Sequence, residues 1–167
     1  LVMIAENPNA TVELIPMLSA SPWIANELAR YPVLLDTFLQ QRYRHLPDKP
    51  ELRDILRQRL LRVEPNDEEE LLSVLRLFKK NQVLAVAASD VLAERPIMKV
   101  SDSLTYIAAV VLEAALERAF AELVKRYGYP IGKDGDPVTE ADCGFAIIGY
   151  GKLGGLELSY SSDLDLV

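Results

Sequence analysis

The chain has 167 residues, 50% of them hydrophobic and 26% charged, so it is long enough to bury a globular core and is not expected to be disordered or fibrous. Eighteen Lys and Arg against 25 Asp and Glu give a net charge of −7, which disfavours nucleic acid as a partner because phosphate backbones require a broad basic surface. The single cysteine, Cys143, cannot form an internal disulfide, and this favours a reducing, cytoplasmic location.

No apolar run comes near the roughly 20 residues that a membrane-spanning helix needs, so no membrane partner is expected. The chain begins at Leu1 without an initiator methionine and stops at Val167 inside a predicted strand. Both ends indicate a piece of a longer protein.

Residues 1–128 are predicted to form a helical region, because apolar residues recur three and four positions apart and Pro, Ser or Asx residues precede each run. About six helices are expected: 9–19, 22–29, one that starts at Pro32, 51–62, 67–93 and 104–127. Residues 98–102 are interpreted as a connector, Trp23 as a core residue, and Gly128 as a helix end in the left-handed αL conformation.

The composition changes after the last predicted helix. Residues 129–143 hold glycines and prolines among charged residues, which predicts a connecting loop and a domain boundary. Residues 144–149 predict a buried strand, and the alternation of Asp163 to Leu166 predicts a second one. The expected fold class is therefore mainly α, followed by the first strands of a truncated α/β domain over residues 144–167.

The glycine-rich segment that begins at Gly149 has three competing interpretations. A Walker phosphate loop fails, because Ala146 and Leu153 stand where that loop needs Gly and Ser or Thr. A Rossmann fingerprint is formally matched by Gly149, Gly151 and Gly154. However, residues 152–162 are too few for the crossover helix that a parallel strand requires.

The third interpretation is a two-metal site for nucleotidyl transfer. Asp163 and Asp165 lie two positions apart on a predicted strand, so their carboxylates project from one face roughly 6.6 Å apart and can converge on Mg²⁺ ions. Gly149 and Gly151 leave room for a triphosphate, and Lys152 adds a positive charge. Ser162 either contacts phosphate or caps a turn before the strand.

The run from Gly149 to Leu166, Gly-Tyr-Gly-Lys-Leu-Gly-Gly-Leu-Glu-Leu-Ser-Tyr-Ser-Ser-Asp-Leu-Asp-Leu, resembles the nucleotidyltransferase motif of the glutamate-ammonia ligase adenylyltransferase family. The Met-Lys-Val-Ser-Asp segment at 98–102 is similar to the helical region that precedes it. The resemblance implies a sheet of the DNA polymerase β type and transfer of AMP from ATP to a tyrosine of glutamine synthetase. It also implies Mg²⁺ held by Asp163 and Asp165, phosphates near Gly151 and Lys152, and regulation by glutamine and the PII signal protein.

The motif is more similar to the C-terminal, adenylylating half of that bifunctional family. The alternatives are the deadenylylating half, which would use similar residues for phosphorolysis, and a helical docking or regulatory module without catalysis. The third metal-binding carboxylate of such sites is expected beyond Val167, so this chain alone is expected to be inactive.

Overall fold

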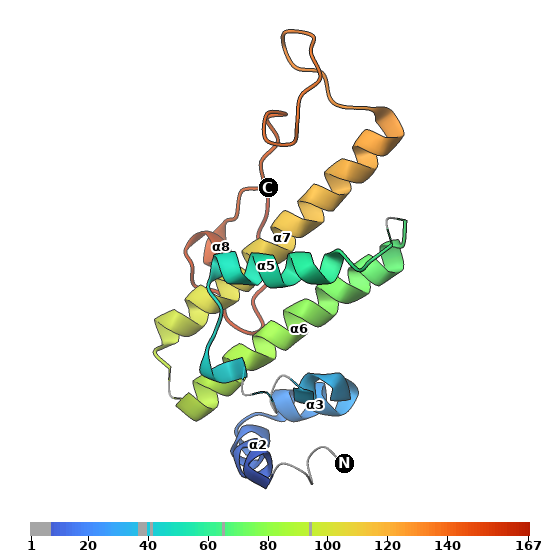
Figure 1. The fold of residues 1–167 in the computed structure, drawn as a ribbon. Helices are drawn as coiled ribbons and strands as arrows, with labels where there is room; N and C mark the ends of the chain where they lie inside the picture. Colours follow the sequence, from blue (N-terminus) through green and yellow to red (C-terminus); the bar gives the residue numbers. More distant parts are fainter. Residues whose placement is uncertain (1–7, 37–39, 41, 65, 94) are drawn as a thin grey trace.

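The computed structural model describes residues 8–36, 40, 42–64, 66–93 and 95–167 (Figure 1). Its fold is mainly helical, as predicted, and the described residues form no strand. The helices are α2 (Pro8–Ala20), α3 (Pro22–Arg30), α5 (Lys49–Leu60), α6 (Glu68–Ala93), α7 (Ile97–Tyr127) and α8 (Gly151–Gly154), with 3₁₀ turns η1 (Pro32–Leu34) and η2 (Arg42–Arg44).

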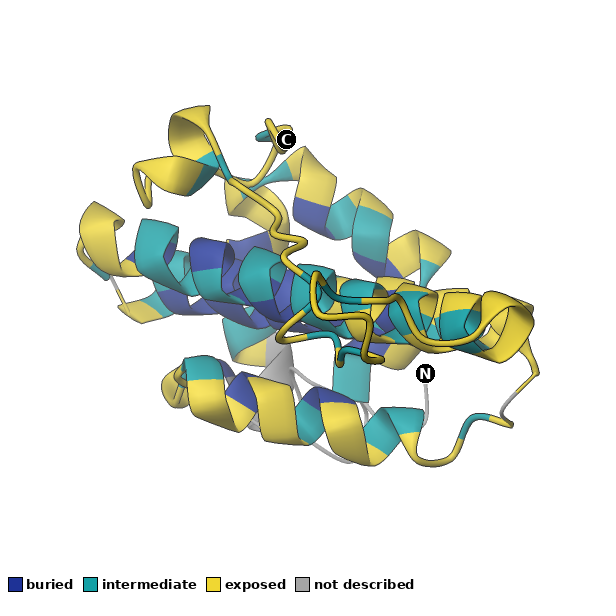
Figure 2. Ribbon diagram, turned by 90° about the horizontal axis from the view of Figure 1, so that it is seen from above, coloured by how far each residue is buried: buried dark blue, intermediate teal, exposed yellow. Residues whose placement is uncertain are grey.

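Helix α6 is the centre of the molecule. Every residue from Asn81 to Ser89 is buried, because α7, α5 and the pair α2–α3 pack around it (Figure 2). A helix that is buried all round needs neighbours on each side, and the small side chains of Ala85, Ala87 and Ala88 allow them to approach closely. The predicted helix 67–93 and its role in the core are thus confirmed.

Two hydrophobic clusters form on α6. The first joins α5, α6, α7 and one residue of the C-terminal segment, and its buried members are Leu52, Leu56, Leu75, Phe78, Val83, Val86, Val100, Leu104, Ile107, Val110 and Leu158. The second joins α2, α3 and the 3₁₀ turns to α6, and its buried members are Met17, Ile24, Leu28, Leu34, Tyr43, Leu84, Ala87 and Ala88. The N-terminal helices therefore share no separate core of their own.

Side-chain caps fix two helix starts. At α5, Asp48 accepts a hydrogen bond from the backbone N–H of Glu51 at 2.9 Å, and the Glu51 carboxylate accepts one from the backbone of Asp48 at 2.9 Å. Before α6, Asp67 accepts a hydrogen bond from the backbone N–H of Glu70 at 2.8 Å. Asp67 therefore caps the start of α6.

The prediction of a connector at 98–102 is wrong, because α7 already begins at Ile97 directly after Pro96. The polar side chains turn back onto their own helix instead of capping a new one: the Ser103 hydroxyl donates to the carbonyl of Lys99 at 2.9 Å, and the Thr105 hydroxyl donates to that of Ser101 at 2.8 Å.

Three further expectations need correction. Gly128 ends α7 with a positive φ of 82°, but its ψ of 175° lies outside the αL region. The helix expected from Pro32 begins as the 3₁₀ turn η1 and is α-helical at Leu35 and Asp36, and residues 37–39 lie outside the described part. Trp23 is 41% exposed and packs at the edge of the helical layer, because α3 turns Ile24 and Leu28 to the core instead.

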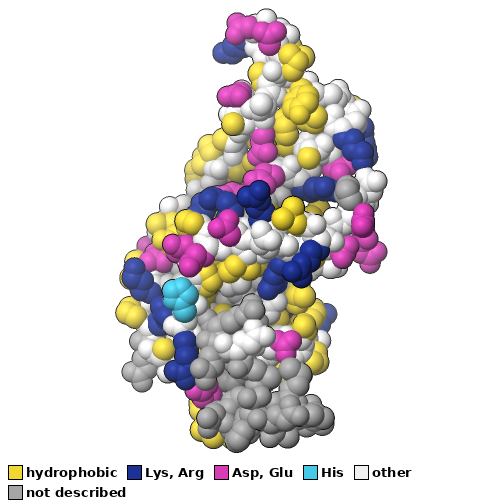
Figure 3. Space-filling model, in the orientation of Figure 1, with side chains coloured by type: hydrophobic (Ala, Val, Ile, Leu, Met, Phe, Trp, Pro, Cys, Tyr) yellow, Lys and Arg dark blue, Asp and Glu magenta, His cyan; other side chains and the backbone are white. Residues whose placement is uncertain are grey.

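Acidic and basic side chains are interspersed over α5 and α6 on the face drawn in Figure 3, and they do not form one continuous basic patch there. Several pair with one another: Glu113 of α7 binds Lys49 and Arg53 of α5, each at 2.8 Å. None of the described helices has the length and hydrophobicity needed to span a membrane.

Candidate functional site

The two segments predicted as strands pair in antiparallel fashion, although neither becomes a strand. Gly149 and Leu166 form an isolated bridge. Ile148 and Val167 exchange backbone hydrogen bonds of 2.8 and 3.0 Å, and the N–H of Tyr150 donates to the carbonyl of Asp165 at 2.8 Å. The described residues thus show no strand over 144–149 or 163–166, only this bridge and its hydrogen bonds, and a two-stranded pair without a further strand is only marginally stable.

This pairing also decides between two of the interpretations above. A Rossmann unit needs a parallel second strand, reached through a crossover helix. Here residues 151–164 connect antiparallel segments and contain only the one-turn helix α8. The dinucleotide-binding interpretation of Gly149, Gly151 and Gly154 is thus excluded for this connection.

The glycines build a turn that leaves almost no free space. A Cβ on Gly154 would lie 2.5 Å from the carbonyl oxygen of Gly149, and a Cβ on Gly149 would lie 2.8 Å from Cδ2 of Leu153. Leu153 in turn packs against the first hydrophobic cluster. The turn is therefore held to the helical region by an apolar side chain from its own centre.

Gly151 brings the glycine turn and the acidic segment together. It adopts φ +54°, and a Cβ there would lie 2.5 Å from Oδ2 of Asp165. The space that the sequence suggested for a phosphate is thus bordered directly by the Asp165 carboxylate. A glycine is needed here both for the positive φ and for this close approach.

The apolar face of the paired segments lies against α7. Ile147 and Leu166 line a cavity of about 370 Å³ together with Leu112 and Leu116 of α7. Neighbouring residues in an extended segment point to opposite faces. Leu166 therefore faces the helix and Asp165 faces away from it, toward Gly151.

The remaining predicted site residues surround this point. Lys152 is exposed and, among the described residues, forms no ion pair with a carboxylate. Asp163 is exposed and lies two residues ahead of the paired stretch, so its position on the same face as Asp165 stays a prediction. Ser162 closes a turn: its hydroxyl accepts from the N–H of Ser159 at 2.9 Å.

The donor set suits a hard cation only in part. Carboxylate oxygens of Asp163 and Asp165 are the ligands that Mg²⁺ prefers, and phosphates and water usually complete its shell. Within the described residues, no group of three or more acidic, His or Cys side chains could hold a metal ion. The structure places one of the two carboxylates, that of Asp165, beside the glycine turn, and a shared site for a metal and a nucleotide stays a prediction.

The contacts that join residues 158–160 to the helices were not predicted from the sequence. The Tyr160 hydroxyl donates to Oδ2 of Asp90 on α6 at 2.9 Å, and the Tyr160 and Trp23 rings lie with centroids 6.1 Å apart. Leu158 is 4% exposed and belongs to the first cluster. The only available signal was the tyrosine within Ser-Tyr-Ser-Ser, which no pattern links to residue 90 or 23.

Comparison with known proteins shows the family to which the chain belongs. The profile of the glutamate-ammonia ligase adenylyltransferase family matches residues 11–167. The chain belongs to this family. It is 54% identical over all 167 residues to the bifunctional glutamine synthetase adenylyltransferase/adenylyl-removing enzyme of Acinetobacter baylyi. The chain spans 18% of the length of that relative. Family membership thus covers both the helical region and the glycine and aspartate residues of the candidate site.

Proposed function

We propose that this chain contributes part of the catalytic centre of an enzyme that transfers AMP from ATP to a tyrosine of glutamine synthetase. The observation that carries the proposal is the contact of the Asp165 carboxylate with Gly151, which the antiparallel pairing of the two segments produces. An acidic group at a glycine turn is what a site for a metal-bound triphosphate requires. The name of the relative from Acinetobacter baylyi supports the choice of glutamine synthetase as the acceptor.

In this reaction the phenol oxygen of the acceptor forms a bond to the α-phosphorus of ATP, the bond from that phosphorus to the β-phosphate oxygen breaks, and pyrophosphate and the phenol proton leave. Asp163 and Asp165 would hold Mg²⁺, which neutralises charge on the phosphates. Lys152, exposed and unpaired among the described carboxylates, supplies a mobile positive charge beside the turn. Gly151 would let the backbone approach the phosphates beside Asp165, whereas the side-chain position of Gly149 is occupied by Leu153.

The form Gly-Tyr-Gly-Lys-Leu-Gly-Gly favours the adenylylating half. Membership of the family supports a nucleotidyltransferase sheet in which the two paired segments would be joined by further strands. Control by glutamine and PII belongs to the same proposal. The deadenylylating alternative predicts phosphate-dependent release of ADP from modified glutamine synthetase. A helical docking module predicts capture of glutamine synthetase without any effect of the aspartates.

The proposal is tested by incorporation of labelled AMP into glutamine synthetase by the full-length protein. Asp163→Asn and Asp165→Asn keep the side-chain volume but remove the charge, and each is expected to lower incorporation by about three orders of magnitude or more. Asp134→Asn is the matched control, because Asp134 is an exposed aspartate in the connecting loop. Full incorporation by Asp163→Asn and Asp165→Asn would show that these carboxylates are not metal ligands.

A further inference from the structure

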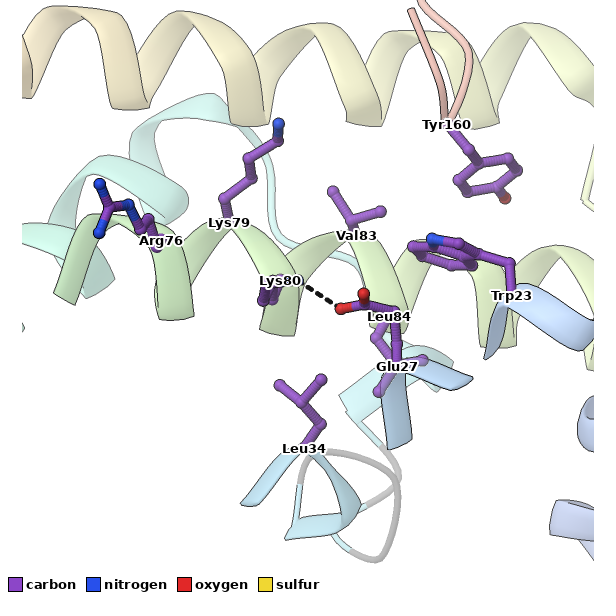
Figure 4. Close-up of a pocket in the computed structure, with 9 residues that line it drawn as sticks. All are labelled: Trp23, Glu27, Leu34, Arg76, Lys79, Lys80, Val83, Leu84 and Tyr160. Atoms are coloured by element: carbon purple, nitrogen blue, oxygen red, sulfur yellow. Dashed lines mark hydrogen bonds and ion pairs between the residues drawn. The ribbon is translucent and has the colours of Figure 1, made fainter. Parts of the chain in front are cut away.

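Tyr160 joins the segment between the glycine turn and the two aspartates to the helical layer. Its hydroxyl donates a 2.9 Å hydrogen bond to Oδ2 of Asp90 on α6, a residue 70 positions away in the sequence. Its ring centroid lies 6.1 Å from that of Trp23 on α3, with the ring planes inclined by 36°. Figure 4 shows the Tyr160 ring, on the C-terminal segment, beside the Trp23 ring on α3. One side chain therefore contacts two helices.

The residues next to Tyr160 connect it to the candidate metal ligands through a closed turn. Leu158 is buried in the cluster between α5, α6 and α7, so the chain enters this turn from a fixed point. The N–H of Ser162 donates to the carbonyl of Ser159 at 3.1 Å, and the two hydroxyls lie 2.8 Å apart. Asp163 follows this closed turn directly. A displacement of Tyr160 would therefore move the start of the acidic segment.

The surroundings of Tyr160 are loosely packed, which makes its specific contacts important. A cavity of about 300 Å³ borders its ring beside Lys80 and Glu27, and another of about 400 Å³ borders it beside Asp90. Close packing thus does little to hold the ring. Burial and then the hydrogen bond to Asp90 raise the pKa of Tyr160 above its ordinary value near 10, so its hydroxyl remains a donor well above neutral pH.

We infer that Tyr160 is a positioning residue: through Asp90 and Trp23 it fixes the segment 159–165, and with it the carboxylates of Asp163 and Asp165, to helices α6 and α3. The inference rests on the proposed function of those carboxylates as metal ligands. It makes the N-terminal helices part of the framework of the catalytic centre, although none of their residues is assigned to the substrate.

Hydrogen–deuterium exchange of the full-length protein tests the contact without reference to activity. Tyr160→Phe removes only the hydroxyl, and it is expected to speed exchange of amides within 159–165 about tenfold, as expected for the loss of a hydrogen bond to a charged acceptor. Asp90→Ala should do the same, whereas Asp90→Asn keeps an acceptor oxygen and should retain most of the protection. Tyr127→Phe, at a tyrosine that is 74% exposed, is the control.

Kinetics of AMP incorporation test the consequence for the carboxylates. Tyr160→Phe is expected to lower kcat about tenfold and to raise the Mg²⁺ concentration for half-maximal rate, while KM for glutamine synthetase stays unchanged. Asp90→Asn, which keeps an acceptor for the Tyr160 hydroxyl, should retain most of the wild-type kcat. A rise in KM for glutamine synthetase alone would place Tyr160 in a docking surface and overturn the inference.

The two proposals fail in different ways. If Asp163→Asn abolishes AMP incorporation while Tyr160→Phe changes neither the exchange of 159–165 nor the Mg²⁺ dependence, the positioning role is wrong and the proposed function stands. If Tyr160→Phe loosens 159–165 but Asp163→Asn stays fully active, the segment is positioned as inferred and the proposed function is wrong.

Discussion

The carboxylate of Asp165 fills the space that a side chain at Gly151 would occupy, since a Cβ there would lie 2.5 Å from Oδ2. Gly151 also has φ +54°, which costs an L-residue about 1 kcal/mol or more. The requirement for glycine at this position therefore comes from two independent causes.

Gly151→Ala is expected to displace the Asp165 carboxylate and to lower AMP incorporation by the full-length protein about a hundredfold, because a catalytic group moved by about 1 Å loses about that factor. Gly135→Ala is the control: Gly135 also has a positive φ, of 87°, but a Cβ added there would meet no atom of a non-neighbouring residue within 4 Å. Similar activities of the two variants would mean that only backbone strain matters at Gly151.

Leu158 anchors the C-terminal segment in the helical core. Leu158→Ala removes a side chain that is 4% exposed, and the free energy of unfolding is expected to fall by about 2–4 kcal/mol, measured by urea denaturation. The control is Leu61→Ala, at a side chain that is 69% exposed. Equal effects at the two positions would contradict the packing described for Leu158.

The start of α5 depends on the reciprocal cap between Asp48 and Glu51. Asp48→Ala is expected to lower the free energy of unfolding by about 1 kcal/mol, whereas Asp48→Ser keeps an acceptor and should cost only a few tenths of that value. Thermal or urea denaturation distinguishes the two variants. An Ala variant as stable as the Ser variant would show that the cap contributes nothing.

The pairing of α5 with α7 should depend on pH through Glu113. Burial raises the pKa of Glu113, but the hydrogen bonds and charges of Lys49 and Arg53 outweigh it and hold the pKa below the usual 4.5. A lowered folded-state pKa stabilises the protein above about pH 4.5, and this contribution is lost as the pH falls through the folded-state value. Glu113→Gln should therefore destabilise the protein at pH 7, by at most about 1 kcal/mol because the pair is partly exposed.

Denaturation of the wild type and of Glu113→Gln at pH 7 and at pH 3 checks this expectation. The two proteins should differ at pH 7, and the difference should shrink as the pH falls toward 3 and Glu113 takes up a proton. A difference of the same size at both pH values would assign the effect to packing and not to charge.

The sequence predicted the features that local chemistry determines. The predicted helix 67–93 agrees with α6, and the paired segments bring Gly151 and Asp165 together, while a metal-binding role of Asp163 and Asp165 stays a prediction. The connector at 98–102 was wrong because Pro96 starts the helix earlier, and Ser and Thr hydroxyls can bond within a helix as well as cap one.

Long-range contacts were beyond the reach of local patterns. Trp23 was expected in the core, yet it packs at the edge against Tyr160, because α3 presents other residues to α6. The hydrogen bond from Tyr160 to Asp90 links residues 70 positions apart, and neither residue belongs to a motif that indicates the other. Strand formation likewise depends on neighbours that no pattern within 144–167 supplies.

The pairing of Gly149 with Leu166 fixes which side of the hairpin carries charge. If the register slipped by one residue, Asp165 would turn toward the hydrocarbon side chains of α7 and Leu166 would turn toward the glycine turn. Burial of an unpaired carboxylate against leucines is strongly unfavourable. Packing against α7 thus disfavours the shifted register. A deletion of one residue between Leu158 and Asp163 is therefore expected to destabilise the pairing even where every chemical group of the site is retained.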